Sequence, residues 1–252
     1  MEIKFLETAG ESIAGRKRKH NEDNFLICRH RTRPALLALV ADGIGGHAHG
    51  ETASRICCAD MLDEALSVPD AVWDEKWLTD ALERINRKIF DRNFNEKRPY
   101  PAGCTVTAAV FTPQEVITAN AGDSRIYEFD TLTGSLTRLT TDHRPDQKLI
   151  TKLKTVVPDI SEKKINAMIL RSLGSRHHLD LDITRTIRRK ECSYMLCSDG
   201  LYCRLSDEKL QQIFAQHHSA RTLTAGLMRA ALLSGSTDNI TIISCTPIQE
   251  KN

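Results

Sequence analysis

Aromatic residues, long apolar runs and an excess of either charge are all missing from this chain of 252 residues. Phe, Tyr and Trp make up only 5% of it, which predicts a core built mainly from aliphatic side chains. The longest purely apolar stretch, 35–41, is far too short to cross a membrane. With 35 basic and 33 acidic residues the net charge is +2, a balance that argues against a dedicated binder of nucleic acid or of membrane surfaces.

Signals for export and for disulfide bonds are also missing. The first fifteen residues contain no apolar run of signal-peptide length. None of the eight cysteines forms a C-x-x-C pair or stands at a metal-ligand spacing from histidine. Because most of them lie within apolar stretches, we expect reduced, buried thiols in a cytoplasmic protein. The cysteines are Cys28, Cys57, Cys58, Cys104, Cys192, Cys197, Cys203 and Cys245.

The apolar pattern predicts a layered α+β domain. Strands are expected at 3–8, 25–29, 36–41, 105–111, 115–119, 125–129, 136–139, 183–187, 194–197 and 240–245, and helices at 51–66, 73–94, 205–217 and 220–233. Short turns between consecutive strands favour antiparallel pairing, and helices that come in pairs would pack outside such sheets. No repeat or flexible linker divides the chain. The polar, Lys-rich stretch 142–164 is expected to be a solvated loop.

Acidic residues stand at the ends of the predicted strands. Asp42 and Asp199 directly follow apolar strands, Asp238 directly precedes one, and Asp123 lies in a turn between two. The pair Glu22-Asp23 precedes a further strand. In antiparallel sheets the end of one strand lies beside the start of its neighbour. We therefore expect these carboxylates to gather at one edge, although any one of them alone is an ordinary turn residue.

Carboxylates gathered in this way need cations, because like charges at close range raise one another's pKa values and cost stability. Ligand sets made only of oxygen select Mg²⁺ or Mn²⁺ over Zn²⁺. Two such ions about 4 Å apart can share a water molecule and activate it at neutral pH. Gly43, Gly45 and Gly46 would leave room for the backbone to approach an ion or a phosphate.

Taken together, the motifs resemble those of the metal-dependent serine/threonine phosphatases of type 2C, the PPM family, in their bacterial form. The matching elements are RKHNED from Arg18, VADGIGGHAHGETAS from Val40, GCT from Gly103, NAGDSRIY from Asn120, LTTDHR from Leu139, LRSLG from Leu170, CSDGL from Cys197 and STDNIT from Ser236. Each is short, but all stand in the family's order over nearly the whole chain. The resemblance implies a four-layer α-β-β-α sandwich, in which helix pairs flank two antiparallel sheets, over a single domain of residues 1–252.

The resemblance also implies a set of metal ligands. Asp42 would bridge two Mn²⁺ or Mg²⁺ ions, and Glu22 and the Gly43 carbonyl would join it on one of them. Asp199 and Asp238 would hold the other. Asp123, together with Asp199, would hold a weaker third ion of the kind found in bacterial members.

Further roles follow from the same resemblance. Asp23 would orient bound water from behind the ligands, and Arg18 would clamp the substrate phosphate. Residues 142–170 would form a variable flap beside the site. A hydroxide that bridges the metals would attack phosphorus in line and release the seryl or threonyl oxygen. The expected partners are phosphorylated substrates of a Ser/Thr kinase, bound by a monomer, with no nucleic acid and no membrane involved.

Some assignments stay open at this point. The position after Asp42-Gly43 is Ile44, where animal and plant members have histidine, so the general acid is His47, His49, His143 or a water held by a metal. A catalytically inactive phosphoprotein-binding module with the same fold is the main alternative. A hydrolase of small phosphate esters or nucleotides is another. The D-x-D-x-T sequence at 180–184 resembles a dehalogenase-type phosphatase motif, but no buried apolar strand precedes it.

Overall fold

Two five-stranded antiparallel sheets lie face to face in the computed structural model, which describes residues 5–44, 48–68, 70–96 and 101–248. The first sheet has the strand order β1 (Leu6–Ile13), β12 (Ile240–Pro247), β11 (Cys192–Cys197), β8 (Arg125–Asp130) and β9 (Leu136–Arg138). The second has the order β10 (Asp182–Ile187), β7 (Glu115–Ala121), β6 (Val106–Phe111), β3 (Leu36–Ala41) and β2 (Asn24–Arg29). A short ribbon, β4 (Gly43–Ile44) with β5 (Gly103–Cys104), extends from the second sheet toward the site described next.

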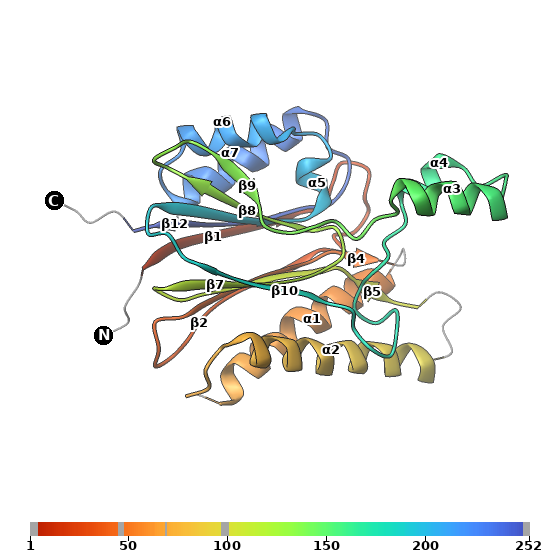
Figure 1. The fold of residues 1–252 in the computed structure, drawn as a ribbon, viewed down its shortest axis with the longest axis horizontal. Helices are drawn as coiled ribbons and strands as arrows, with labels where there is room; N and C mark the ends of the chain where they lie inside the picture. The colour runs from red at the N-terminus through yellow and green to blue at the C-terminus, as the bar shows by residue number, and fades with distance from the viewer. Residues whose placement is uncertain (1–4, 45–47, 69, 97–100, 249–252) are drawn as a thin grey trace.

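Helices cover the outer face of each sheet (Figure 1). The second sheet carries α1 (Ala48–Ser67) and α2 (Glu75–Asn95). The first carries α5 (Asp199–Tyr202), α6 (Asp207–Gln216) and α7 (Ala220–Leu233). The predicted four-layer α-β-β-α sandwich is therefore confirmed.

Three apolar layers hold the sandwich together. One lies between α1, α2 and the second sheet, and another between α5 to α7 and the first sheet. The third lies between the sheets, where Leu36 and Val40 share a buried cluster with Leu196 and Ile243. All six residues of β3, β6 and β11 are buried. The side chains in these layers are mostly aliphatic, as the scarcity of aromatic residues predicts.

Some boundaries differ from the prediction. The first strand runs from Leu6 to Ile13 and so continues past its predicted end at residue 8, because it pairs along its whole length with β12. Residues 3 and 4 of the prediction lie outside the described residues. The region predicted as one helix at 205–217 follows a separate short helix, α5. All eight cysteines are free; six are buried, but Cys58 is only partly buried and Cys203 is exposed. In the described part of the chain, no helix is both long and apolar enough to span a membrane.

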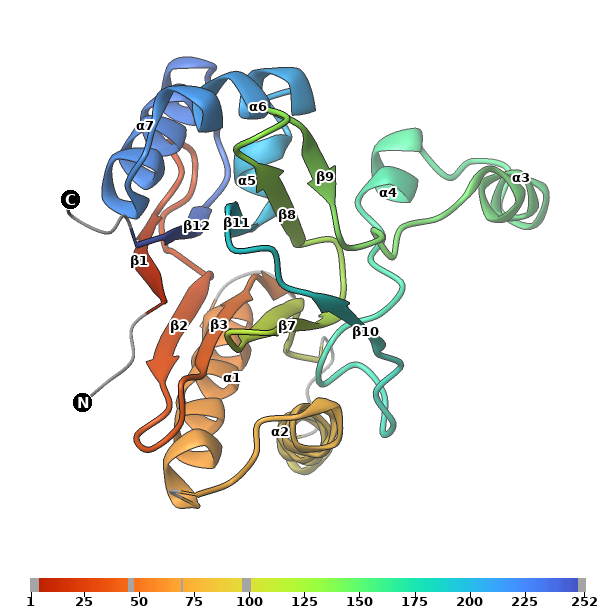
Figure 2. The ribbon, with the colours of Figure 1, turned by 60° about the vertical axis from the view of Figure 1, so that its left-hand side comes forward.

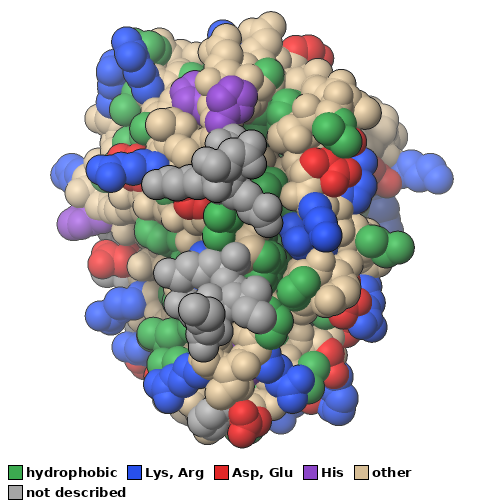
Figure 3. Space-filling view, turned by 90° about the vertical axis from the view of Figure 1, so that its left-hand side faces the viewer, with side chains coloured by type: hydrophobic (Ala, Val, Ile, Leu, Met, Phe, Trp, Pro, Cys, Tyr) green, Lys and Arg blue, Asp and Glu red, His purple; other side chains and the backbone are tan. Residues whose placement is uncertain are grey.

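The Lys-rich stretch contains two helices, where the sequence predicted a loop. They are α3 (Gln147–Val156), capped by Asp146, and α4 (Glu162–Asn166), capped by Ser161. Figure 2 shows both helices to one side of the layers. We call residues 142–170 the flap. On the face turned away from the flap, the basic and acidic side chains that Figure 3 shows are scattered and do not gather in one patch.

Candidate active site

An open cleft of about 510 Å³ lies where one end of the two sheets meets the flap. It is lined by every predicted site residue except Asp123: Arg18, Glu22, Asp23, Asp42, Gly43, Asp199 and Asp238. The flap contributes Lys163, Asn166, Ala167 and Ile169 to its wall. The strand ends thus bring together residues that lie more than 200 positions apart in the sequence.

Asp42 is positioned by a contact with the short ribbon beside it. Its backbone N–H donates to Thr105 Oγ1 over 3.1 Å, and its carbonyl accepts from Thr105 N over 2.8 Å. Thr105 Oγ1 in turn lies 2.8 Å from Ser124 Oγ, in the turn that carries Asp123. The threonine of the G-x-T motif therefore fixes Asp42 at the end of β3 and ties it to the Asp123 turn.

Glu22 reaches the cleft through a close approach of three backbone segments. A Cβ added to Gly43 would lie 2.5 Å from Gly50 C and 2.6 Å from the Glu22 carbonyl oxygen. A Cβ added to Gly50 would lie 3.0 Å from Glu22 Oε2. Ser54 Oγ donates to the Glu22 carbonyl over 2.5 Å. The start of α1 therefore presses Glu22 and Gly43 together, and larger residues than glycine would block this.

The first sheet contributes Asp199 and Asp238 from the other side of the cleft. Asp199 is the first residue of α5, and Asp238 stands two residues before β12. A Cβ added to Gly200 would lie 1.9 Å from the Asn239 carbonyl oxygen. The glycine of the S-D-G motif therefore lets α5 touch the segment before β12, and this contact brings the two aspartates to the same place.

Asp23 lies beneath the cleft and is only 4% exposed. Its Oδ2 accepts hydrogen bonds from Ser198 Oγ and Thr241 Oγ1, each 2.7 Å long. Burial raises the Asp23 pKa to about 6, and the two hydroxyl donors oppose this shift. Asp23 therefore joins the loop before β2 to β12 and to the residue that follows β11.

Crowding of negative charge dominates the electrostatics of the cleft. Burial raises the Asp42 pKa well above its ordinary value, and the carboxylates of Asp23, Asp199, Asp123 and Asp238 raise it further. Burial raises the Asp199 pKa to about 7, with Asp123 and Asp238 adding to the shift and Arg144 opposing it. These side chains are thus costly to keep ionised together unless a cation neutralises them.

Arg18 and Asp238 form an ion pair at the cleft. Arg18 Nε lies 2.8 Å from Asp238 Oδ1, and an Arg18 terminal nitrogen lies 2.8 Å from Oδ2. Both residues were predicted to act here, one on phosphate and one on metal. The structure brings them together and turns the guanidinium fork onto a carboxylate, a group with the same two-oxygen geometry that a phosphate offers.

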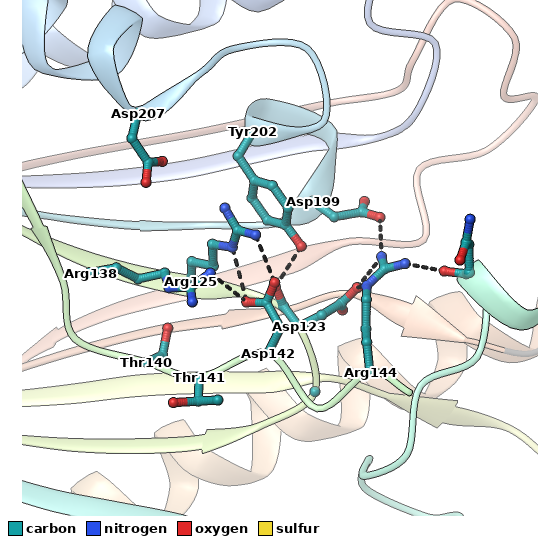
Figure 4. A network of polar contacts seen from close by, with 12 residues as sticks. Asp123, Arg125, Arg138, Thr140, Thr141, Asp142, Arg144, Asp199, Tyr202 and Asp207 are labelled. Atoms are coloured by element: carbon teal, nitrogen blue, oxygen red, sulfur yellow. Dashed lines mark hydrogen bonds and ion pairs between the residues drawn. The ribbon is translucent and has the colours of Figure 1, made fainter. Parts of the chain in front are cut away.

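Arg144 is a site residue that the sequence analysis did not single out. Its guanidinium lies between Asp123 and Asp199, and it also donates to the Asn166 carbonyl in the flap (Figure 4). Arg144 Nε is 2.7 Å from Asp123 Oδ2, and a terminal nitrogen is 3.2 Å from Asp199 Oδ2. An arginine directly after the T-D-H element was the available signal.

His143, one of the candidate general acids, is buried and its ring contacts other groups. Its Nδ1 accepts from Gly122 N over 3.0 Å, so the proton is on Nε2, which lies 3.0 Å from Asp182 Oδ2. Asp180 and Asp182, the acids of the dehalogenase-like sequence, both pair with Arg171. His47 lies outside the described residues, and so does the side chain of His49.

The donor set of the cleft fits a hard divalent cation. The side-chain oxygens are carboxylates from both sheets, and the close contact of Glu22, Gly43 and Gly50 forms a cradle that a Cβ would fill. Within the described ranges, no three His, Cys, Asp or Glu side chains converge closely enough to hold an ion as they stand. In the same cleft, Arg18 pairs with Asp238, and Arg144 pairs with Asp123 and Asp199.

Comparison with known proteins gives the family. Residues 13–233 match the family model for protein phosphatase 2C. The chain belongs to the protein phosphatase 2C family. The motif-based prediction is thereby confirmed, and the chain is an enzyme of the serine/threonine protein phosphatase class.

Named relatives agree with this assignment. The serine/threonine phosphatase stp of Listeria welshimeri is 28% identical over 232 residues, which are 91% of each chain. The structure of Stp1 from Staphylococcus aureus shares the fold, with a TM-score of 0.83 at 24% identity over 99% of this chain and 98% of that one. The catalytic domain of PstP, in complex with two manganese ions, has a TM-score of 0.79 at 28% identity, over 97% and 99% of the two chains.

Proposed function

We propose that this phosphatase hydrolyses phosphoserine and phosphothreonine in proteins with the help of two Mn²⁺ or Mg²⁺ ions. One observation carries the proposal: carboxylates from both sheets converge on a single open cleft beside Arg18, and Asp42 faces four other acids there. Such a concentration of negative charge is tolerable when divalent cations bind it. The manganese ions in the PstP structure support the same choice of cofactor.

Each side of the cleft would serve one ion. Asp42, at the centre, would contact both. Glu22 and the Gly43 carbonyl would complete the ligands on the α1 side, and Asp199 and Asp238 those on the α5 side. When bound, two such ions lower the pKa of a shared water so that it can attack phosphorus directly at neutral pH.

Arg18 would bind the phosphate of the substrate. Its planar fork is already held in a two-oxygen contact by Asp238. When Asp238 turns to an ion, the fork becomes available to two phosphate oxygens at the same place. Arg18 would then stabilise the charge that develops as the seryl or threonyl oxygen leaves.

Asp23 would act from beneath the ligands. Its Oδ2 is fixed by the hydroxyls of Ser198 and Thr241, so its carboxylate keeps one orientation. A carboxylate held in this way can accept a hydrogen bond from a water in the cleft and fix that water's direction.

The openness of the cleft fits a protein substrate. Lys163 and Asn166 of the flap line one wall, so a phosphorylated segment would lie between the flap and the loop that carries Arg18. We propose that residues 1–252 form one catalytic domain with the flap at 142–170, acting as a monomer in the cytoplasm on substrates of a Ser/Thr kinase. The free cysteines agree with a reducing compartment.

The test is phosphate release from a phosphothreonine peptide with Mn²⁺, with Mg²⁺ and with EDTA. An Asp199→Asn variant removes a proposed metal ligand. The matched control is Asp207→Asn, since Asp207 begins α6 and its carboxylate accepts a hydrogen bond from the Tyr127 hydroxyl. We expect turnover with either ion, none in EDTA, a loss of about 10²-fold or more in Asp199→Asn, and wild-type rates in the control. A folded protein that binds the peptide without turnover would instead be a phosphoprotein-binding module, and faster hydrolysis of nucleotides would point to small esters.

A further inference from the structure

Arg144 is a cation built into the acidic end of the cleft. Its Nε bonds Asp123 Oδ2 over 2.7 Å, and a terminal nitrogen bonds Asp199 Oδ2 over 3.2 Å. Asp123 is 1% exposed, so its charge is almost fully withdrawn from water. The guanidinium thus contacts a buried carboxylate, Asp123, and a partly buried one, Asp199, and occupies the place that a divalent ion held by the same pair would need.

We propose that Arg144 takes the place of a third divalent ion between Asp123 and Asp199, so that this chain holds two ions rather than three, and that the same side chain ties the flap to this pair. The inference rests on the two-ion function proposed above. It differs from the expectation from the family resemblance, in which Asp123 and Asp199 bind an ion of their own.

The neighbouring side chains bind other groups, so that Arg144 is the arginine that contacts Asp123 and Asp199. A second arginine nearby, Arg125, donates to Asp142 from Nε over 2.9 Å and from one terminal nitrogen over 2.7 Å, and its guanidinium lies 3.5 Å from the centre of the Tyr202 ring. Tyr202 Oη donates to the Asp123 backbone carbonyl, not to its carboxylate (Figure 4). Arg125 is therefore bound to Asp142, and Arg144 is the arginine that offsets part of the negative charge of Asp123 and Asp199.

A fixed guanidinium and a divalent ion exclude each other at this place. The guanidinium and the ion would both need the carboxylate oxygens of Asp123 and Asp199 that Arg144 now contacts. The positive charges of the guanidinium and the ion would also repel each other at close range. Asp123 Oδ1 is buried and finds no hydrogen-bond partner among the described residues. Removing the guanidinium would free Oδ2 beside it and leave a two-oxygen face open to a cation.

The third contact of Arg144 connects the cleft to the flap. A terminal nitrogen donates to the Asn166 carbonyl, the last residue of α4. Within the same short helix, Lys163 and Asn166 line the cleft. A lysine at position 144 would keep the charge near the acids but could not span all three acceptors, because its ammonium is a single point rather than a fork. The metal-count role and the flap role can thus be separated by substitution.

The experiment counts Mn²⁺ bound to the full chain, by isothermal titration calorimetry and by the electron paramagnetic resonance signal of free Mn²⁺. It compares wild type, Arg144→Gln, Arg144→Lys and the control Arg138→Gln, which removes a nearby exposed arginine that contacts Asp142 instead. Hydrogen exchange of residues 162–167 follows the flap in the same samples. Phosphate release is measured in parallel.

The expected counts are two ions in wild type, Arg144→Lys and Arg138→Gln, and three in Arg144→Gln. The amide exchange rates of the flap should rise about tenfold in both Arg144 variants, because each loses a hydrogen bond from a charged group. The exchange rates should not change in Arg138→Gln. Three ions in wild type overturn the proposal even if no variant folds. Two ions in Arg144→Gln with wild-type exchange overturn it as well. A wild type that binds no ion and releases no phosphate overturns the proposed function itself, a result distinct from either of these.

Discussion

Gly200 lies against the backbone carbonyl of Asn239, so close that a side chain on the glycine would fall 1.9 Å from that oxygen. This contact links the start of α5 to the start of β12. It is also the reason that Asp199 and Asp238, neighbours of the two residues in contact, meet in the cleft. Because Gly200 has no Cβ, the two backbone segments can approach each other and bring the two proposed metal ligands together.

We predict that Gly200→Ala weakens Mn²⁺ binding by about tenfold or more and lowers the free energy of unfolding by roughly 1–3 kcal/mol, because the backbone has to move apart. Titration calorimetry and chemical denaturation measure the two effects. The control is Gly134→Ala, where φ is +70° and no atom lies within 4 Å of the new Cβ. It should lose about 1 kcal/mol from its left-handed backbone and keep its metal affinity. Equal metal affinities in the two variants would contradict the prediction.

Arg18→Gln should separate phosphate binding from metal binding. We expect kcat/KM to fall by about 10²-fold, because the transition state loses its planar cation. Mn²⁺ affinity should stay the same or rise, since Arg18 no longer competes for Asp238. Steady-state kinetics and metal titration test both halves. Arg16→Gln, two residues earlier in an exposed stretch, should behave as wild type. A drop in metal affinity in Arg18→Gln would show that the pair organises the ligands instead.

The metal-free protein should lose stability as the pH rises from about 4 to about 7. Asp199 has a pKa of about 7 in the folded protein, against an ordinary value of 3.8. Between these pH values the folded state therefore binds more protons than the unfolded chain. The stability that this proton binding contributes is lost as the pH rises through the folded pKa. Asp199→Asn should therefore melt at a higher temperature than wild type in EDTA at pH 8, by about 2–4 °C for each kcal/mol recovered.

The difference between the two proteins should shrink at pH 4.5, where wild type is protonated at this position. In saturating Mn²⁺ at pH 8 the order should reverse, because only wild type keeps the full ligand set. Calorimetric scans at both pH values, with and without the ion, provide the measurement. The same melting difference at both pH values in EDTA would refute the assignment to Asp199.

His143 is predicted to support the structure and not to donate the catalytic proton. His143→Asn keeps an acceptor for the Gly122 N–H, and His143→Ala keeps neither that contact nor the one to Asp182. We expect the alanine variant to lose about 1–3 kcal/mol of stability and the asparagine variant to lose less. The pH–rate profile should keep its shape in both. Loss of its alkaline limb in the asparagine variant would instead make His143 the general acid.

The sandwich and the carboxylates of the cleft could be predicted from the sequence because each depends on a local signal. Buried strands such as β3 are continuous apolar runs, and the acids stand next to them. Arg144 had only a weak local signal, its place directly after the T-D-H element, because its role depends on acids 21 and 55 positions away in the chain.

The helices of the flap were missed for a different reason. No residue of α3 is buried. Its apolar residues Leu149, Ile150 and Leu153 are only partly buried and stand among lysines, a composition typical of loops. The Asp146 side chain caps α3 by accepting from Leu149 N, and an aspartate at this position is the signal that could have marked the start of the helix.

The pairing of β1 with β12 has a consequence for how the chain folds. Ser12 and Thr241 are hydrogen-bonded partners 229 positions apart, so the first strand has no neighbour in its own sheet until almost all of the chain exists. Such non-local pairing is slow to form and leaves a strand edge open to other chains in the meantime. During synthesis on the ribosome, the second sheet with α1 and α2 can assemble first, while β1 waits for the strand that completes the core.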